Sequence, residues 1–246
     1  TSTRVYECED FSQLPSSGVS LVSVKERYDY RDYKPEDLRT VGLRNDVPLV
    51  RSVATHYSNI GFNGTVIVGS NPSDVMARIF SEHFNVQNGS RIFGFGSYLD
   101  SLRAKSIIAR EADVDPQSVN ILVVGEHGDT MVPIYSQGKI GRRPLLEYSI
   151  DLESIKAELR KSGATIVKKL GHSSFGPSKA FLELCTFLNT QNPTHLLPMS
   201  TLYQDGVYIG LPIQKSGERF LVEDPQLNNI EQEEFKILCL MRRKKR

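Results

Sequence analysis

The sequence predicts an α/β protein, and three features of the 246-residue chain support that fold class. Short β-branched runs at 19–24, 65–70 and 119–124 are typical of buried strands. Segments with apolar residues at helical spacing lie between these runs, and such alternation of strand and helix indicates an α/β fold. A hydrophobic content of 39% is ample for a packed core.

The first part of the chain predicts strand, loop, helix, strand and helix in that order. The strand at 19–24 precedes a loop at 25–35 that is dense in charge and tyrosine. Apolar residues at helical spacing follow within 36–59. The strand at 65–70 then leads into a helix near 73–84.

The second part predicts a strand at 91–93, a helix through 99–112 and a strand at 119–124. A polar helix follows at about 151–170. Another helix is expected from Pro177 to about Leu188, because the fixed φ of proline suits a first helical turn. Further on, two strand-like runs (VYIGLPI and RFLVE) precede a closing amphipathic helix at 229–243.

Composition excludes several classes of function. The 30 basic and 29 acidic residues leave a net charge of +1, so no long-range field indicates a nucleic-acid or membrane partner. Cys8, Cys185 and Cys239 lack metal-ligand spacing, so we expect no metal site and a cytoplasmic location. The basic tail, Arg242 to Arg246, leaves nucleic-acid binding as a minor hypothesis beside a solvated chain end.

The motif GEHGD at 125–129 directly follows a predicted strand. Its glycines allow a sharp turn that would leave His127 open to a cleft. Imidazole suits acid–base chemistry near neutral pH. A loop histidine without function is the alternative that this motif alone leaves open.

The segment GFGSYLDSLR at 94–103 places two charges on one helical face, since Asp100 and Arg103 are three residues apart. Such a pair on its own is usually an exposed ion pair worth well under about 1 kcal/mol. Together with GEHGD, it predicts a site.

In this order and spacing, SNPSDV after a strand, GFGSYLDSLR and GEHGD resemble the lactate/malate dehydrogenase family. The similarity runs from about residue 8 to 238. The resemblance implies an incomplete doubly wound, Rossmann-like parallel sheet in residues 1–90 and an α+β catalytic domain in 91–246. Later segments that agree are KKLGHSSFG at 168–176, DGVYIGLP at 205–212 and NNIEQEEF at 228–235.

The resemblance also implies roles for three residues. His127 would be the general base that takes the hydroxyl proton while hydride leaves for the nicotinamide of NAD, and the general acid in reverse. Asp100 would hold the other imidazole nitrogen and stabilise the charged ring. Arg103 would grip the substrate carboxylate in a two-pronged contact.

Five further contacts are implied by resemblance. Arg39 would close over the substrate and polarise its carbonyl, with a solvated arginine at a helix start as the alternative. Asn71 would meet substrate and nicotinamide, Gly69 and Ser70 would lie against NAD, and Ser173 would line the substrate pocket. The substrate would be a 2-hydroxy or 2-keto acid, and the protein a homo-oligomer, either a dimer or a tetramer.

Two departures from the family pattern bear on function. The strand, G-x-G-x-x-G and helix that bind pyrophosphate are not found in these 246 residues, so we expect a truncated product, a domain fragment or a degenerate paralogue. Glu26 stands where the family usually has a small turn near the phosphates, and Asp32 stands where the family distinguishes lactate from malate. The identity of the substrate therefore stays open.

Two main hypotheses follow. The first is an NAD-dependent oxidoreductase of the L-2-hydroxy acid dehydrogenase class, similar to L-lactate dehydrogenase, with His127 as acid and base. The second is a non-catalytic family remnant that keeps the assembly surfaces and acts as an oligomerisation or interaction subunit.

Overall fold

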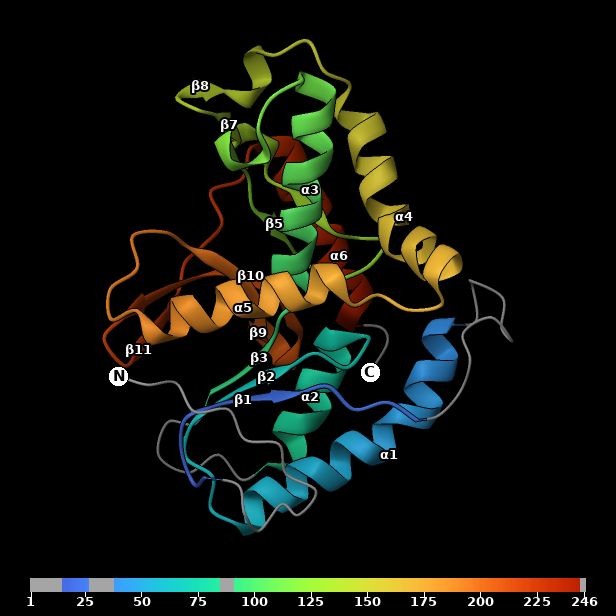
Figure 1. The fold of residues 1–246 in the computed structure, drawn as a ribbon, viewed down its shortest axis with the longest axis vertical. Helices are drawn as coiled ribbons and strands as arrows, with labels where there is room; N and C mark the ends of the chain where they lie inside the picture. Colours follow the sequence, from blue (N-terminus) through green and yellow to red (C-terminus); the bar gives the residue numbers. More distant parts are fainter. Residues whose placement is uncertain (1–14, 27–37, 85–90, 244–246) are drawn as a thin grey trace.

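The structure, a computed structural model, describes residues 15–26, 38–84 and 91–243 and contains a central six-stranded sheet (Figure 1). Three strands pair in parallel: β1 (Val19–Val22), β2 (Thr65–Val68) and β3 (Arg91–Gly94). Three antiparallel strands continue the sheet: β9 (Leu197–Leu202), β10 (Tyr208–Ser216) and β11 (Arg219–Val222). The predicted α/β class is confirmed.

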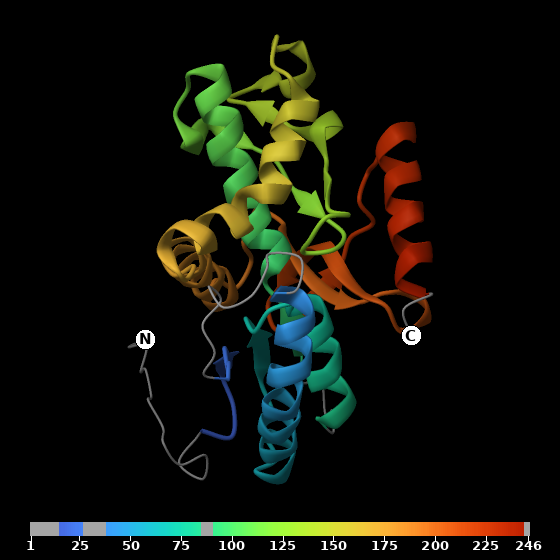
Figure 2. The same ribbon diagram turned by 90° about the vertical axis from the view of Figure 1, so that its right-hand side faces the viewer.

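Helices cover both faces of the parallel half of the sheet (Figures 1 and 2). Val66 and Val68 of β2 pack in the cluster with α1 (Leu38–Asn59) and α2 (Ser73–His83). Ile67, between them, packs in the cluster with α5 (Phe175–Asn189) and the start of α3 (Gly96–Ala112). Burial on both faces explains why this strand is an uninterrupted β-branched run in the sequence.

The second core surrounds the far half of α3. There α3 packs against α4 (Leu152–Leu170) and a small sheet of β4 (Val119–Asn120), β7 (Lys139–Ile140) and β8 (Arg143–Pro144). The closing helix α6 (Asn229–Arg243) packs against the hairpin-like pair β5 (Val123–Val124) and β6 (Val132–Pro133). Figure 2 shows α6 on the side of the molecule opposite α4 and α5.

Most predicted elements are found, but the structure differs from the expectation in several places. Helix α3 begins at Gly96 rather than near 99, and α5 begins two residues before Pro177. The prediction of a single strand at 119–124 is wrong. The two ends of this segment form separate strands, β4 and β5, which pair with different partners. Strand β9 has no counterpart among the expected elements, because Pro198 weakens its strand pattern.

The sheet continues across the expected domain boundary. Strand β3 extends the parallel sheet of β1 and β2, and β9 continues from β3. The division into 1–90 and 91–246 stays a prediction. Within the part of the chain that the structure describes, no helix is both long and apolar enough to cross a membrane.

Candidate active site

Asp100 and Arg103 lie one and two turns into α3, which starts directly after the carboxyl end of β3. The Asp100 side chain is completely buried, and that of Arg103 is 15% exposed. Nη1 of Arg103 donates to Oδ1 of Asp100 at 3.1 Å. The pair is therefore a largely buried one, not the exposed ion pair that the spacing alone would suggest.

His127 lies in the loop between β5 and β6, 27 positions after Asp100. The loop starts at Gly125, whose φ of +88° favours glycine and whose backbone pairs with Gly210 in both directions, at 2.8 and 2.7 Å. Nδ1 of His127 lies 2.6 Å from Oδ2 of Asp100. The three side chains that the sequence predicts to form a site therefore meet at one carboxylate.

A glycine makes room for the imidazole. A β-carbon on Gly96 would lie 2.3 Å from Cγ and 2.5 Å from Cβ of His127, far closer than side-chain atoms approach one another. The first residue of α3 must therefore lack a side chain for His127 to occupy its position beside Asp100.

Opposing effects determine the pKa of His127. Burial disfavours the imidazolium, but the Asp100 charge, the hydrogen bond to Asp100 and the Asp74 charge together outweigh burial and the opposing Arg103 charge. The pKa is consequently raised above its ordinary 6.5. Because a carboxylate can only accept, Nδ1 carries the proton toward Asp100, which leaves Nε2 for exchange with a ligand.

The residues expected against the cofactor follow the carboxyl end of β2. The buried Ser70 hydroxyl accepts from the backbone N of Val24 at 2.9 Å and donates to its backbone O at 2.8 Å, which ties the ends of β1 and β2 together. Gly69 packs closely on Phe95, whose ring lies 3.0 Å from the position of a β-carbon there. Asn71 is exposed at the end of the strand, and the peptide bond that follows it is cis.

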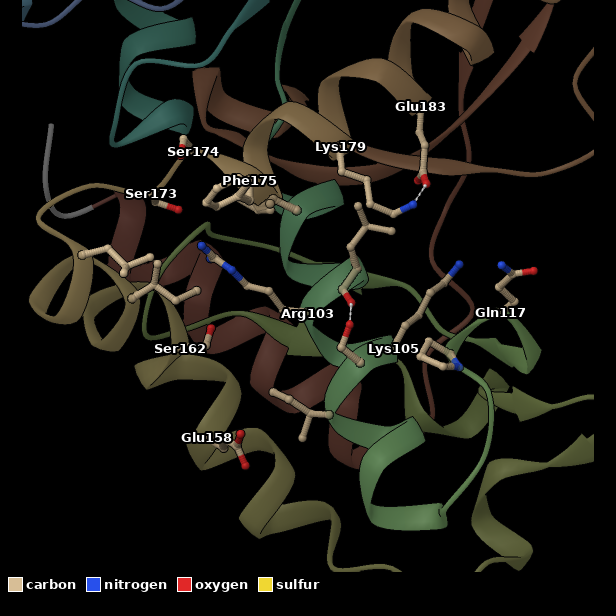
Figure 3. A pocket seen from close by; sticks show the side chains of 18 of the residues that line it. Arg103, Lys105, Gln117, Glu158, Ser162, Ser173, Ser174, Phe175, Lys179 and Glu183 are labelled. Atoms are coloured by element: carbon tan, nitrogen blue, oxygen red, sulfur yellow. Dashed lines mark hydrogen bonds and ion pairs between the residues drawn. The ribbon is translucent and has the colours of Figure 1, made fainter.

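A cavity of about 750 Å³ opens between α3, α4 and α5 (Figure 3). Figure 3 shows Arg103 reaching from α3 toward α4. Ser162 and Ser173 line the side of the cavity toward which Arg103 points. Arg103 and Ser173 both line this cavity, and their roles toward a substrate stay predictions. Asp100, His127 and Asn71 do not line it. The other lining residues are Leu99, Leu102, Lys105, Ser106, Ile107, Asp115, Pro116, Gln117, Glu158, Ile166, Leu170, Ser174, Phe175, Gly176, Lys179 and Glu183.

Two expected site residues lie outside the part whose side chains are described. The backbone of Arg39 belongs to α1, but its side chain is not among the described ones. Asp32 lies outside the described ranges. Glu26 is exposed, and its backbone N donates to Oδ1 of Asp46 at 2.8 Å.

Asp74, the acidic residue of SNPSDV, belongs to this site, although the sequence analysis assigns it no role. It is 1% exposed, and its Oδ2 accepts from the backbone N of His127 at 2.8 Å. An acidic residue in the first turn of a helix ordinarily interacts with the helix dipole, so position alone gives no sign of a long-range partner.

A protein-family model matches more than half of the chain and so identifies its family. The model of the lactate/malate dehydrogenase α/β C-terminal domain matches residues 97–242. The chain belongs to the lactate/malate dehydrogenase family. The structure agrees, since its parallel β1–β3 sheet and the domain that follows match solved members of that family.

Individual family members give the scale of the similarity. The L-lactate dehydrogenase of Lactococcus lactis subsp. cremoris is 28% identical over 205 residues, which are 77% of this chain and 65% of that protein. That of Corynebacterium jeikeium is 31% identical over 217 residues, 82% of this chain and 66% of that protein. The chain therefore spans slightly less than two thirds of the length of these relatives.

Solved structures of the family match nearly the whole chain. The malate dehydrogenase of Salinibacter ruber has a TM-score of 0.81 at 26% identity and covers 96% of this chain and 75% of its own. The malate dehydrogenase of Plasmodium falciparum has a TM-score of 0.83 at 22% identity and covers 96% of this chain and 78% of its own. The predicted fold class is therefore confirmed.

Proposed function

We propose that the chain is the catalytic part of an NAD-dependent L-2-hydroxy acid dehydrogenase of the L-lactate dehydrogenase type. The observation that supports this most strongly is the convergence on Asp100, where His127 Nδ1 lies at 2.6 Å and Arg103 Nη1 at 3.1 Å. A buried carboxylate that orients a histidine beside an arginine suits acid–base chemistry on an anionic substrate.

In this proposal, His127 moves one proton. Its Nε2 accepts the proton of the substrate hydroxyl during oxidation and returns it to the carbonyl oxygen during reduction. Asp100 keeps the ring oriented and stabilises the imidazolium between these events. NAD, when bound, accepts or supplies the hydride.

The remaining residues position the substrate. Arg103 has N–H groups beyond the one that contacts Asp100, and these would bind the substrate carboxylate beside Ser173. Asn71 would meet the substrate and the nicotinamide from the end of β2, and Arg39 would polarise the substrate carbonyl from α1.

In this proposal, the nicotinamide end of NAD would lie at the carboxyl end of β2. The carboxyl ends of the parallel strands are the general ligand site of such sheets, and Gly69, Ser70 and Asn71 lie there as candidate contacts for the nicotinamide end. A glycine-rich pyrophosphate loop is not found among the 246 residues. A cytoplasmic homo-oligomer, either a dimer or a tetramer, is part of this proposal by family membership.

The test compares the 246-residue chain with a complemented chain, in which a glycine-rich, dinucleotide-binding half of the kind that the family resemblance implies is fused ahead of Thr1. We expect little or no NADH oxidation by the 246-residue chain with pyruvate, oxaloacetate or branched 2-keto acids, because the nicotinamide must be held against the substrate carbon. The complemented chain should turn over, and H127N within it should lose roughly 100-fold or more in kcat.

Two outcomes bear on different parts of this proposal. Robust turnover by the 246-residue chain would refute the inferred dependence on an added phosphate-binding half. A complemented chain that folds and binds NADH but stays inactive with every keto acid would favour the interaction-subunit hypothesis.

A further inference from the structure

We propose that Asp74 is a positioning residue for His127, which fixes the backbone of the GEHGD loop while Asp100 fixes the ring. The catalytic meaning of this inference rests on the proposed function. Its structural content rests on contacts that join three separate parts of the fold.

The Asp74 carboxylate lies between α2, the GEHGD loop and β9. Its Oδ2 accepts from the backbone N of His127 at 2.8 Å, and its Oδ1 accepts from the hydroxyl of Ser200. Asp74 is 1% exposed and Ser200 is fully buried. A carboxylate is costly to bury and is retained where donors satisfy its oxygens, and the N-terminal turn of α2 favours a negative charge there.

The first turn of α2 also approaches the imidazole itself. The hydroxyl of Ser73 lies 2.5 Å from the point where a β-carbon on Gly96 would stand, and Cγ of His127 lies 2.3 Å from the same point. The starts of α2 and α3 therefore both lie directly beside His127. Asp74 binds the backbone N of His127, and Asp100 binds its imidazole ring, so both carboxylates hold this loop residue in place.

This arrangement joins two ends of the candidate site. Helix α2 begins two residues after Asn71, at the carboxyl end of β2. The hydrogen bond from His127 to Asp74 therefore links the strand end that carries Asn71 to the loop that carries the imidazole. Since misplacement of a reacting group by about 1 Å can cost roughly 100-fold in rate, such a link has direct value for proton transfer.

Charge provides a second way to observe the link. Burial opposes the imidazolium, and the charge of Asp74 acts with that of Asp100 to raise the pKa of His127, against Arg103. Loss of the Asp74 charge should therefore lower the midpoint at which His127 titrates, while loss of its oxygens should free the His127 backbone N–H.

The experiment uses NMR on the 246-residue chain without ligand. It measures hydrogen exchange of the His127 backbone amide and the titration of its imidazole, assigned among the five histidines by loss of the signal in H127N. D74N keeps an oxygen acceptor without the charge, so its titration midpoint should fall while the amide stays protected. D74A removes both, and exchange of the amide should rise roughly tenfold or more.

The matched control is D46N. Asp46 is also a buried carboxylate that accepts from a backbone N–H, that of Glu26 at 2.8 Å, but it belongs to α1. D46N should leave the exchange and titration of His127 unchanged. A similar response in D46N and D74N would mean that the effect is general loosening, and would overturn the inference.

Two further outcomes bear on the inference. A folded D74A in which the His127 amide and imidazole behave as in the wild type would overturn it. If D74A does not fold, S200A removes the Ser200 hydroxyl that donates to the carboxylate and should raise His127 amide exchange. Unchanged exchange in S200A with an unchanged midpoint in D74N would equally overturn the inference. Because neither measurement needs turnover, failure of H127N to slow the complemented chain would refute the proposed function and leave the Asp74 result standing.

Discussion

Nδ1 of His127 lies 2.6 Å from Oδ2 of Asp100, and the carboxylate that it contacts is completely buried. Screening by solvent ions is weak at such a site, so the charge of Asp100 acts on the imidazole with little attenuation. The same carboxylate contacts Arg103 at 3.1 Å through its other oxygen. One residue of α3 therefore orients both the candidate acid–base group and the candidate anion-binding group.

Replacing Asp100 by asparagine should reduce kcat of the complemented chain by at least about 100-fold, because an amide no longer selects the imidazole tautomer or stabilises the imidazolium. Steady-state NADH oxidation measures this. D113N is the matched control, since Asp113 follows α3 with a φ of +52°, a conformation that asparagine readily adopts. A D100N enzyme with wild-type kcat would contradict the role of Asp100.

The raised pKa of His127 predicts opposite pH dependences for the two reaction directions. Reduction of a keto acid needs the imidazolium, so its kcat/KM should fall as the pH rises through a value above 6.5. Oxidation of the hydroxy acid needs the neutral ring and should increase over the same range. Rate profiles of the complemented chain that rise together with pH in both directions would contradict this assignment.

Because its pKa is raised in the folded state, His127 should make the free energy of unfolding depend on pH. A group whose pKa is higher in the folded state stabilises the fold fully below its unfolded pKa and loses this effect as the pH rises through the folded pKa. The free energy of unfolding of the wild type should therefore exceed that of H127N more at about pH 5.5 than at about pH 9. Urea unfolding at both pH values tests this, and a difference that grows with pH would have the wrong sign.

Replacing Arg103 by lysine should weaken keto-acid binding by roughly 2 kcal/mol or more, because lysine keeps the charge but loses the planar, two-pronged geometry. Calorimetry with the complemented chain and NADH measures the affinity. R110K is the matched control, because Arg110 lies on the same helix but pairs with Glu158 and Glu111 at the surface. Equal affinities in wild type and R103K would remove Arg103 from the site.

Two glycine-to-alanine changes should have opposite effects on stability. G96A places a β-carbon 2.3 Å from Cγ of His127 and should destabilise the fold by about 1–3 kcal/mol through overpacking. Gly163 lies inside α4, where an added β-carbon would have ordinary contact with Nη1 of Arg103, at 3.4 Å. G163A should therefore stabilise the fold by up to about 1 kcal/mol through helix propensity. Urea unfolding distinguishes them, and a G96A variant as stable as the wild type would contradict the close contact with His127.

The sequence predicts well those features that depend on neighbouring residues. Helix α6 occupies the expected 229–243, because a 3.6-residue apolar period is a local property. Asp100 and Arg103 share a helical face for the same reason. Their meeting with His127 is expected from the family resemblance, since spacing along the chain does not imply a contact across 27 positions.

Only the tertiary structure decides the contacts between distant segments. The split of 119–124 into β4 and β5 depends on which strands lie beside each end, and β9 exists because β3 and β10 flank it. The bond between Asp74 and the backbone of His127 spans 53 positions and leaves no periodic sign in the sequence. Patterns of hydrophobicity specify which face of an element is buried, whereas the partner that a buried polar group finds there is determined by how the elements pack.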